Sequence, residues 1–361
     1  MKIKDRYIAK TLLSYTFVVM IVWLSIYSFF NFLSELNSVG KVNYTILEAL
    51  KYVVLLMPEV AYEQATQLIL LGAVLGMGHL STTSQLLIFR ASGVSVLKIT
   101  LSTIKNAMIF LFILILMGEL FAPSLSQYAE KDRSRALGQS SFSTNQDGFW
   151  IRDGDNFINV ENNIDGSLFK GITLIEVNKN NQISRVIQSE NGIFDGKSLN
   201  LNETDIFSID SNNDYENITI KERDALNKKV AFDQELIASL EKEPEDLPTL
   251  TIIKQIRFLT ENKLRSDVFE VELYNRLAKP ISLIAMILLA MLFIFGSSRD
   301  ITLGRKIFLG VTLGLSFELI SRLGGAISLS LEFSPFLSSF LPSLLAIIVA
   351  ISILINKSSN I

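Results

Sequence analysis

The residues of this sequence that carry the most unusual chemistry are ionisable side chains inside apolar stretches. Glu318 and Arg322 stand four positions apart in one such stretch, which predicts an ion pair on one face of a helix. Glu59 and Glu63 have the same spacing in an earlier stretch. Charged groups within a membrane-spanning segment are costly and often mark a transport path. For Glu318 and Arg322, two interpretations stay open: an internal ion pair that lets the helix insert, or a polar face toward a substrate cavity. For Glu59 and Glu63, the two are a polar seam between helices and a substrate route.

The composition argues against catalysis by this chain. Its 361 residues include no cysteine and one histidine, which excludes thiol nucleophiles, disulfides and multi-histidine metal sites. The sequence contains no Gly-x-x-x-x-Gly-Lys-Ser/Thr loop, no Gly-x-Ser-x-Gly turn and no His-Glu-x-x-His motif. We therefore expect a non-enzymatic protein with no catalytic residue, metal site or cofactor of its own.

Charge is distributed unevenly along the chain. Residues 122–277 hold 18 Lys and Arg and 27 Asp and Glu, as a domain in water does. The flanks, 1–121 and 278–361, together hold 15 Lys and Arg and 9 Asp and Glu, which is sparse enough for a membrane. The acidic middle argues against nucleic-acid binding, which needs a basic surface. We expect a membrane part made from both flanks and an aqueous insert between them.

Six apolar stretches are long enough to cross a bilayer, for which a helix needs about 20 residues. The stretches cover residues 11–33, 53–80, 99–121, 278–296, 307–331 and 333–355. Ten lysines and arginines lie on the side of the N-terminus, whereas the short loops opposite hold only Lys41 and Lys51. This asymmetry predicts that both termini are cytoplasmic and that the insert is outside the cytoplasm.

The insert has the pattern of a β-rich domain. Short β-type runs are separated by turn signals, which favours an antiparallel sandwich or jelly roll. The runs are 149–151, 157–160, 172–175 and 183–187, and the turn signals are Asp153-Gly154, Asp165-Gly166, Asn180-Asn181, Asn191-Gly192 and Asp195-Gly196. After Pro248, Ile252, Ile253, Ile256 and Leu259 recur at helical spacing, which predicts a helix that returns to the fourth apolar stretch.

A cytoplasmic segment at about 81–95 joins the second and third stretches. Its sequence, STTSQLLIFRASGVS, predicts a short amphipathic helix. Leu86, Leu87 and Phe89 would form an apolar patch beside Arg90. Such a helix lies on a membrane surface or docks into a partner, and composition leaves both interpretations open.

Several motifs, in this order along the chain, resemble the lipopolysaccharide export permease family of LptF and LptG. They are Asp5-Arg6-Tyr7-Ile8, Lys10-Thr11, Leu75-Gly76-Met77-Gly78, Ala91-Ser92-Gly93, Gly118-Glu119-Leu120-Phe121-Ala122-Pro123, Gly148-Phe149-Trp150, Asp153-Gly154-Asp155-Asn156-Phe157 and Phe293-Ile294-Phe295-Gly296. The Gly-Glu-x-x-Ala-Pro and Asp-Gly-x-Asn-Phe patterns are more similar to LptG than to LptF. The resemblance covers essentially the whole chain.

The resemblance implies an α-helical protein of the bacterial inner membrane, with three spans on each side of a periplasmic β-jellyroll-like domain. In the family, one LptF and one LptG sit on two copies of the ATPase LptB, which binds ATP and Mg. Lipopolysaccharide enters sideways, between the first span of one subunit and the fifth span of the other. Closure driven by ATP moves it through the jellyroll to LptC, a single-span protein, and to LptA, a periplasmic bridge.

The implied function assigns two groups of substrate-contacting residues. Lys131, Arg133 and Arg135 follow the third span and would meet lipid phosphates, as would Lys41 in the first outer loop. Arg133 falls on a basic position of the LptG pattern, whereas Asn31 stands where LptG members commonly carry a lysine. The alternative for 131–135 is solvation of a helix with alternating charges. Apolar residues of spans one and five would line the acyl cavity, or face ordinary lipid: Phe29, Phe30, Phe317 and Ile320.

The segment 81–95 matches the family's ATPase-coupling helix. Gln85 occupies the position where family members commonly carry a glutamate that pairs with an ATPase arginine, which implies a neutral hydrogen bond here. Leu86, Leu87, Phe89 and Arg90 would complete the docking surface. Two other functions stay open: a membrane-anchored sensor or scaffold with a periplasmic ligand, and the permease of another envelope-lipid exporter.

Overall fold

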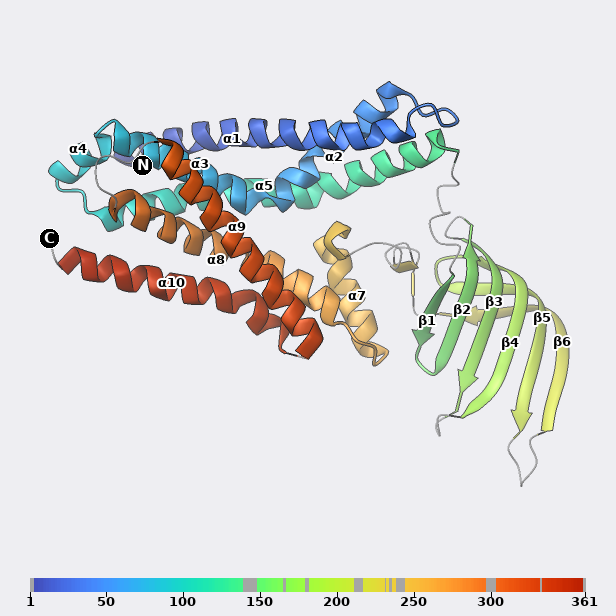
Figure 1. Ribbon diagram of the computed structural model, residues 1–361. Coiled ribbons are helices and arrows are strands. Elements are labelled where there is room, and N and C mark those ends of the chain that lie inside the picture. The colour runs from blue at the N-terminus through green and yellow to red at the C-terminus, as the bar shows by residue number, and fades with distance from the viewer. Residues whose placement is uncertain are drawn as a thin grey trace. The chain divides into compact units, whose positions relative to one another are not determined.

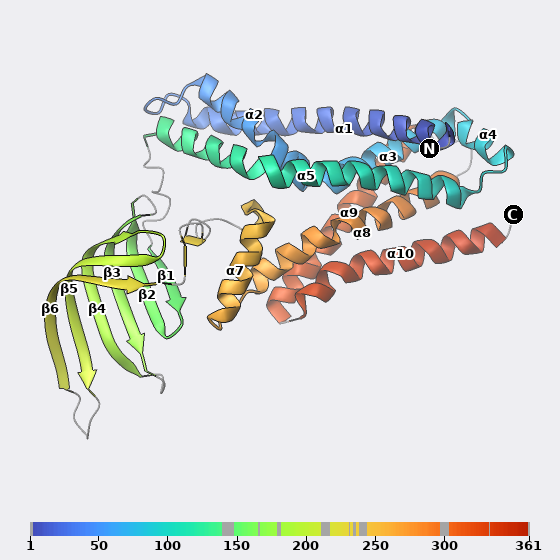
Figure 2. The same ribbon diagram turned by 180° about the vertical axis from the view of Figure 1, so that it is seen from behind.

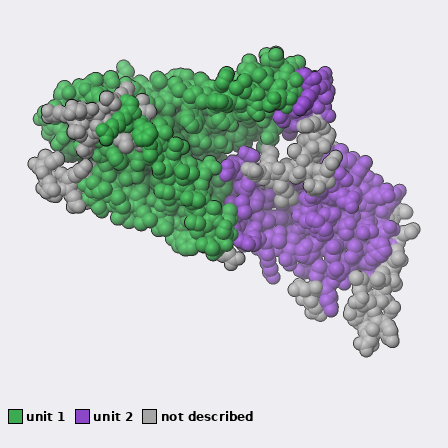
Figure 3. All heavy atoms as spheres, viewed as in Figure 1, with its two compact units in different colours: residues 1–39, 45–130, 270–361 green, residues 40–44, 131–269 purple. Residues whose placement is uncertain are grey.

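The computed structural model describes residues 3–138, 148–164, 167–178, 182–210, 217–230, 232–233, 236–237, 244–296, 303–331 and 333–359. The chain divides into two compact units, which Figure 3 colours green and purple. The helix unit comprises residues 1–39, 45–130 and 270–361, and the sheet unit comprises 40–44 and 131–269.

The helix unit is built from long apolar helices (Figure 1). These are α1 (Ile3–Glu35), α2 (Ile46–Glu63), α3 (Ala65–Thr82), α4 (Gln85–Ala91), α5 (Val96–Ala136), α8 (Asp267–Gly296), α9 (Leu303–Leu331) and α10 (Pro335–Ser359), with the 3-10 turn η1 (Leu36–Ser38) after α1. The predicted limits of the insert, residues 122 and 277, fall inside α5 and α8, because both helices continue beyond their apolar part.

Among the residues that the structure describes, five helices are long and apolar enough to cross a membrane: α1, α3, α5, α8 and α10. Four of them match predicted stretches, and α3 covers only the later part of the second stretch. The remaining stretch, 307–331, forms α9, a helix of 29 residues that is not among these five. The chain is therefore mostly helical, with several helices suited to a bilayer.

The second stretch, predicted as one span over 53–80, is instead shared between α2 and α3. Gln64 separates them with φ −88° and ψ 10°, outside the helical range. Pro58 inside α2 also removes one helical N–H donor. Both helices have 18 residues, and of the two only α3 has the apolar composition of a span. The sequence signals of this break were Pro58 and the polar run around Gln64.

Close packing of α1 on α3 organises the core of the helix unit. Gly72 of α3 lies so near Thr16 of α1 that a Cβ at Gly72 would overlap the threonine. One turn later, a Cβ at Gly76 would lie 3.5 Å from the side chain of Thr11. The Gly72-x-x-x-Gly76 motif therefore permits close helix contact, as such motifs do in membranes. Gly314 of α9 plays a similar part against Leu70, 3.3 Å from its would-be Cβ.

The described part of the sheet unit contains one antiparallel sheet of six strands with the order β1-β2-β3-β4-β5-β6. The strands are β1 (Phe149–Asp153), β2 (Asn156–Asn163), β3 (Leu168–Val177), β4 (Ile183–Phe194), β5 (Ser198–Asp210) and β6 (Asn217–Lys229). The four predicted runs are confirmed as β1 to β4. Each described strand pairs only with its sequence neighbours, so the order is a meander rather than the crossed order of a jelly roll.

Two of the predicted turns are confirmed and one is wrong. Gly154 and Gly196 have φ of +61° and +89° and connect β1 to β2 and β4 to β5. Asn191-Gly192 lies inside β4, because Gly192 leaves space for the side chain of Ile172 on the neighbouring strand. The signals at 165–166 and 180–181 lie outside the described residues.

The sheet bends along one transverse row of residues. The pairing of β2 to β5 skips Glu161, Gly171, Glu190 and Glu203 in turn, which we call the bend row. Gly171 and Glu203 have left-handed φ of +62° and +51°, as expected where a strand is kinked. The hydroxyl of Ser189 lies 2.8 Å from the carbonyl oxygen of Asn191 and 2.5 Å from that of Asn202, which supplies a donor beside the bend. The strands curve in both views (Figures 1 and 2).

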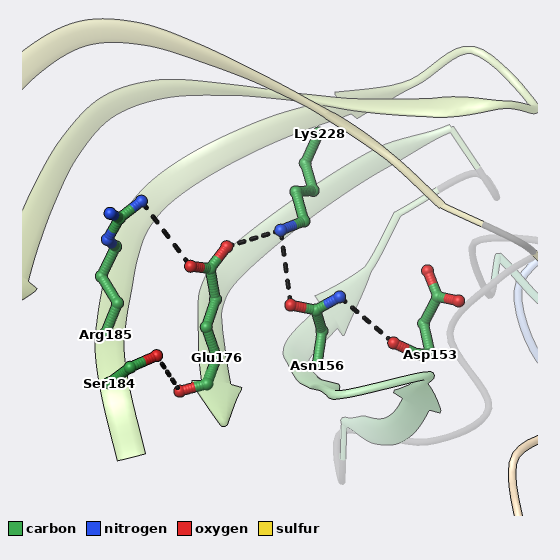
Figure 4. Close-up of polar contacts among 6 residues, drawn as sticks. All are labelled: Asp153, Asn156, Glu176, Ser184, Arg185 and Lys228. Atoms are coloured by element: carbon green, nitrogen blue, oxygen red, sulfur yellow. Dashed lines mark hydrogen bonds and ion pairs between the residues drawn. The ribbon is translucent and has the colours of Figure 1, made fainter. Parts of the chain in front are cut away.

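The bend row divides the sheet into two parts, which we call its limbs. A polar cluster joins the two limbs (Figure 4). Lys228 of β6 places its Nζ 2.5 Å from Glu176 Oε1 of β3 and 3.3 Å from Asn156 Oδ1 of β2. A flat sheet would hold the backbones of β3 and β6 about 14 Å apart, since adjacent strands are about 4.8 Å apart. The contact therefore requires the bend, and it ties residues from opposite sides of the bend row.

Aromatic packing fills the space between the limbs, and α7 (Thr249–Glu261) adds to the same core. Phe169 is fully buried and stacks on Phe194 at 5.9 Å, and Phe258 of α7 belongs to the same cluster. The predicted return helix is confirmed. Its buried positions include Ile252 but not Ile253, which is exposed.

We expect Gly72→Val to destabilise the helix unit, because its side chain would overlap Thr16. Overpacking of this kind costs about 1–3 kcal/mol. Thermal unfolding of the detergent-solubilised chain measures the effect. Gly304→Ala is the control, because nothing lies within 4 Å of its would-be Cβ. Equal melting temperatures for Gly72→Val and the unsubstituted chain would show that the contact is looser than described.

We expect Lys228→Met to loosen the two limbs of the sheet. The variant removes an ion pair whose side chains are about three-quarters shielded, worth about 1 kcal/mol after allowance for solvent screening. Hydrogen exchange of the β3 and β6 amides in the full chain reports the loss of protection. Lys229→Met, at the exposed neighbouring position, is the matched control. An equal effect of both variants would contradict the bridging role.

Candidate functional site

The helix unit contains a polar site between α3 and α9. Arg322 donates from Nε to Glu318 Oε1 at 2.8 Å, so the ion pair expected from their spacing is present. The second carboxylate oxygen of Glu318 accepts from Gln67 Nε2 of α3 at 2.6 Å. Glu318 therefore links two helices, which the sequence did not predict. The Arg322 side chain is 66% exposed in this single chain and so faces outward from the unit.

A second polar site joins α2, α5 and α8. Glu119 of α5 accepts a hydrogen bond from Tyr62 Oη at 2.7 Å and lies 3.6 Å from Arg276 Nη1. Arg276 also donates from Nε to Glu272 at 2.7 Å on its own helix. Lys279 lies 4.0 Å from the centre of the Tyr62 ring, a favourable cation–π position. Two cations are thus set among two carboxylates and an aromatic ring.

The sequence explains how this second site is assembled. Gly118 lies against the Tyr62 ring, and a Cβ there would overlap it. Glu119 follows at once, so the small residue lets the ring approach and the acidic residue meets its hydroxyl. Arg276 and Lys279 stand at the start of the fourth predicted stretch, and that position was the only sequence signal of their role. Glu63 lies within electrostatic range of Lys279, whereas Glu59 lies one turn earlier on α2.

Helix α4 places the proposed docking residues on two different faces. Leu86 is only 4% exposed and belongs to the core of the helix unit, and Phe89 packs against that core. Leu86 is therefore buried and Phe89 is partly buried, so the expected apolar patch of Leu86, Leu87 and Phe89 is not one exposed surface. Leu87 and Ile88 are 51% and 64% exposed, and Arg90 is also exposed. Sequence reasoning missed Ile88 because it treated the segment as one continuous patch.

The basic residues near the end of α5 lie close to a loop that follows α1. The backbone N–H of Asn43 donates to the carbonyl of Ala136 at 3.0 Å, so residues 40–44 contact the end of α5. Lys41, Lys131 and Arg135 are exposed, and Arg133 is half-buried. The sheet unit thus carries four cations on two adjoining segments.

The residues expected to line an acyl cavity differ in their exposure. Phe29 and Phe30 of α1 are exposed, and their rings meet edge to face at 5.7 Å. Ile320 of α9 is also exposed. Phe317 is 7% exposed and packs with Leu70 in the core, so it is not available at the surface of this chain. The apolar pattern could not separate these positions because all four lie in long hydrophobic helices.

We expect Glu318→Leu to destabilise the helix unit by about 1–3 kcal/mol, because it leaves both Gln67 and Arg322 without their shared acceptor. Arg322→Leu should cost less than Glu318→Leu, because Gln67 keeps its hydrogen bond to Glu318 and only one of the two contacts is lost. Thermal unfolding of the two solubilised variants tests the difference. A larger loss for Arg322→Leu would mean that Gln67 does not depend on Glu318.

Known proteins are similar to this chain over most of its length. The family model for the lipopolysaccharide export system permease LptF/LptG matches residues 6–356. The chain is 25% identical to the lipopolysaccharide export system permease protein LptG of Escherichia coli strain K12 over 333 residues, which is 92% of each chain. It is also 25% identical to LptG of Haemophilus influenzae over 326 residues, 90% of each chain. The chain therefore belongs to the LptF/LptG family of lipopolysaccharide export permeases.

Proposed function

We propose that this chain is the LptG-like permease subunit of an ABC-type exporter. It extracts lipopolysaccharide from the outer leaflet of the inner membrane and passes it to a periplasmic bridge, and ATP hydrolysis in a separate ATPase subunit drives the movement. The observation that carries this proposal is the family match over nearly the whole chain, including both units. The two relatives named above are LptG proteins, which favours LptG over LptF.

The proposed topology has six spans, with α9 as the sixth membrane-crossing helix beside the five apolar ones. At about 1.5 Å per residue, its 29 residues are long enough for the hydrocarbon core. The Glu318–Arg322 pair supports this assignment, because neutralisation lowers the cost of placing α9 in lipid. The excess of lysine and arginine on the side of both termini supports a cytoplasmic location for them and a periplasmic sheet unit.

The proposed lipid route uses both units. The exposed aromatic residues Phe29 and Phe30 of α1 and Ile320 of α9 meet acyl chains. Lys41 and the cations of the α5 end meet the phosphates, since cations on adjoining segments suit a molecule with several phosphate groups. These cations are Lys41, Lys131, Arg133 and Arg135. Phe317 is not part of the proposed route, because it is buried.

The proposed partners are an LptF-like permease, an LptB-like ATPase dimer that binds ATP and Mg, an LptC-like single-span protein and an LptA-like bridge. Helix α4 offers the surface for the ATPase. Leu87 and Ile88 supply exposed apolar area next to Arg90, which suits a hydrophobic contact with a charged rim. Gln85 is engaged within the chain itself, because its Oε1 accepts a hydrogen bond from Tyr7.

Co-purification of the tagged chain, with mass spectrometry of bound proteins and lipids, tests the proposal. We expect an LptF-like chain, two ATPase chains and lipopolysaccharide. Leu87→Glu should lower ATPase recovery at least tenfold, because it puts a charge into the contact. Leu250→Glu, an exposed leucine of α7, should not.

Other results would favour the rival functions. Recovery of the chain without any ATPase would support a sensor or scaffold. Recovery with an ATPase but with a different envelope lipid would support another exporter. Either result would overturn the lipopolysaccharide proposal.

A further inference from the structure

The inner face of α4 packs against the beginning of α1. Leu86 belongs to one buried cluster with Ile8 and Leu12 of α1 and with Ile99 of α5. Phe89, one turn after Gln85 on the same face, packs against that cluster. Figures 1 and 2 both show α4 beside the N-terminal end of α1. The outer face of α4, with Leu87 and Ile88, stays exposed.

Tyr7 of α1 holds this inner face at two points. Its hydroxyl donates to Gln85 Oε1 at 2.6 Å, and its ring meets the Phe89 ring edge to face at 6.2 Å and 72°. Gln85 and Phe89 are four residues apart, so a single side chain spans one full turn of α4. A hydrogen bond and an aromatic contact on one turn fix both the rotation and the tilt of so short a helix.

The beginning of α1 is also tied to α5. Asp5 Oδ1 accepts a hydrogen bond from Ser102 Oγ at 2.8 Å. The buried side chains of the described part of α1 are Ile8, Leu12, Thr16 and Glu35, and the first three lie in the first half of the helix. Most of the later part of α1, where Phe29 and Phe30 stand, is exposed. A displacement at the Tyr7 end therefore acts on the half of α1 that holds three of these four buried side chains.

We propose that Tyr7 is a positioning residue that fastens α4 to α1, so that a movement imposed on α4 by a partner is transmitted to α1. The inference rests on the proposed function for the identity of that partner, the ATPase. The Tyr7 contacts themselves do not depend on it. Tyr7 touches neither nucleotide nor lipid in this scheme and acts through Gln85 and Phe89.

Hydrogen exchange of the solubilised chain, without partners, tests whether Tyr7 holds α4 against α1. Tyr7→Phe removes only the hydroxyl and keeps the ring contact with Phe89. We expect the amides of residues 88–92 to exchange roughly fivefold faster, as loss of one hydrogen bond allows. Tyr15→Phe, on the same helix with its ring 5.6 Å from His79, is the matched control and should change nothing there. Unchanged exchange in Tyr7→Phe would overturn the proposal.

Transport by the assembled complex tests the transmission. We expect Tyr7→Phe to keep ATP hydrolysis within twofold but to lower lipopolysaccharide release at least fivefold. Tyr15→Phe, the same control as in the exchange experiment, should keep normal release. Normal release by Tyr7→Phe would overturn the proposal, as would equal loss of hydrolysis and release. If no ATPase associates with the unsubstituted chain, the proposed function is wrong. The hydrogen-exchange experiment still tests whether Tyr7 holds α4 against α1.

Discussion

Arg276 is buried among three helices of the unit, and its charge is balanced by Glu119 on α5 and Glu272 on α8. An isolated cation in this position would be very costly, because apolar surroundings solvate charge poorly. The same constraint applies to Glu318, which meets Arg322 on its own helix and Gln67 on α3. These two clusters restrict how α2, α5 and α8, and separately α3 and α9, can be arranged. The surfaces offered to lipid and partners follow from that arrangement.

In the sheet unit, the polar groups that must find partners belong to the backbone. Bending a sheet breaks pairing along the fold line, and the freed carbonyls need donors. Ser189 supplies one between Asn191 and Asn202, and left-handed residues in β3 and β5 take up the change of direction. The bend then allows Lys228 to reach Glu176 and the aromatic core to close between the limbs. The bend therefore gives the sheet unit a closed apolar core.

Sequence reasoning succeeded where a local pattern decides the structure. Long apolar runs gave the helices, and alternating runs with Asp-Gly turns gave β1 to β4, since both depend on near neighbours. It was wrong where a distant residue decides: Gly192 stays in a strand because Ile172 packs over it. Leu86 and Phe317 turned inward for the same reason, because burial in a hydrophobic helix depends on which other helix packs there. Glu119 and Tyr62, which Arg276 meets on other helices, are also remote along the chain.

The most direct measurement of the central claim is transfer of lipopolysaccharide from proteoliposomes to a soluble LptA-like acceptor. The vesicles would contain this chain with its LptF-like and ATPase partners, and matched vesicles would omit only this chain. The proposed function predicts transfer that requires both ATP and this chain. Equal transfer without this chain, or transfer independent of ATP, would contradict it.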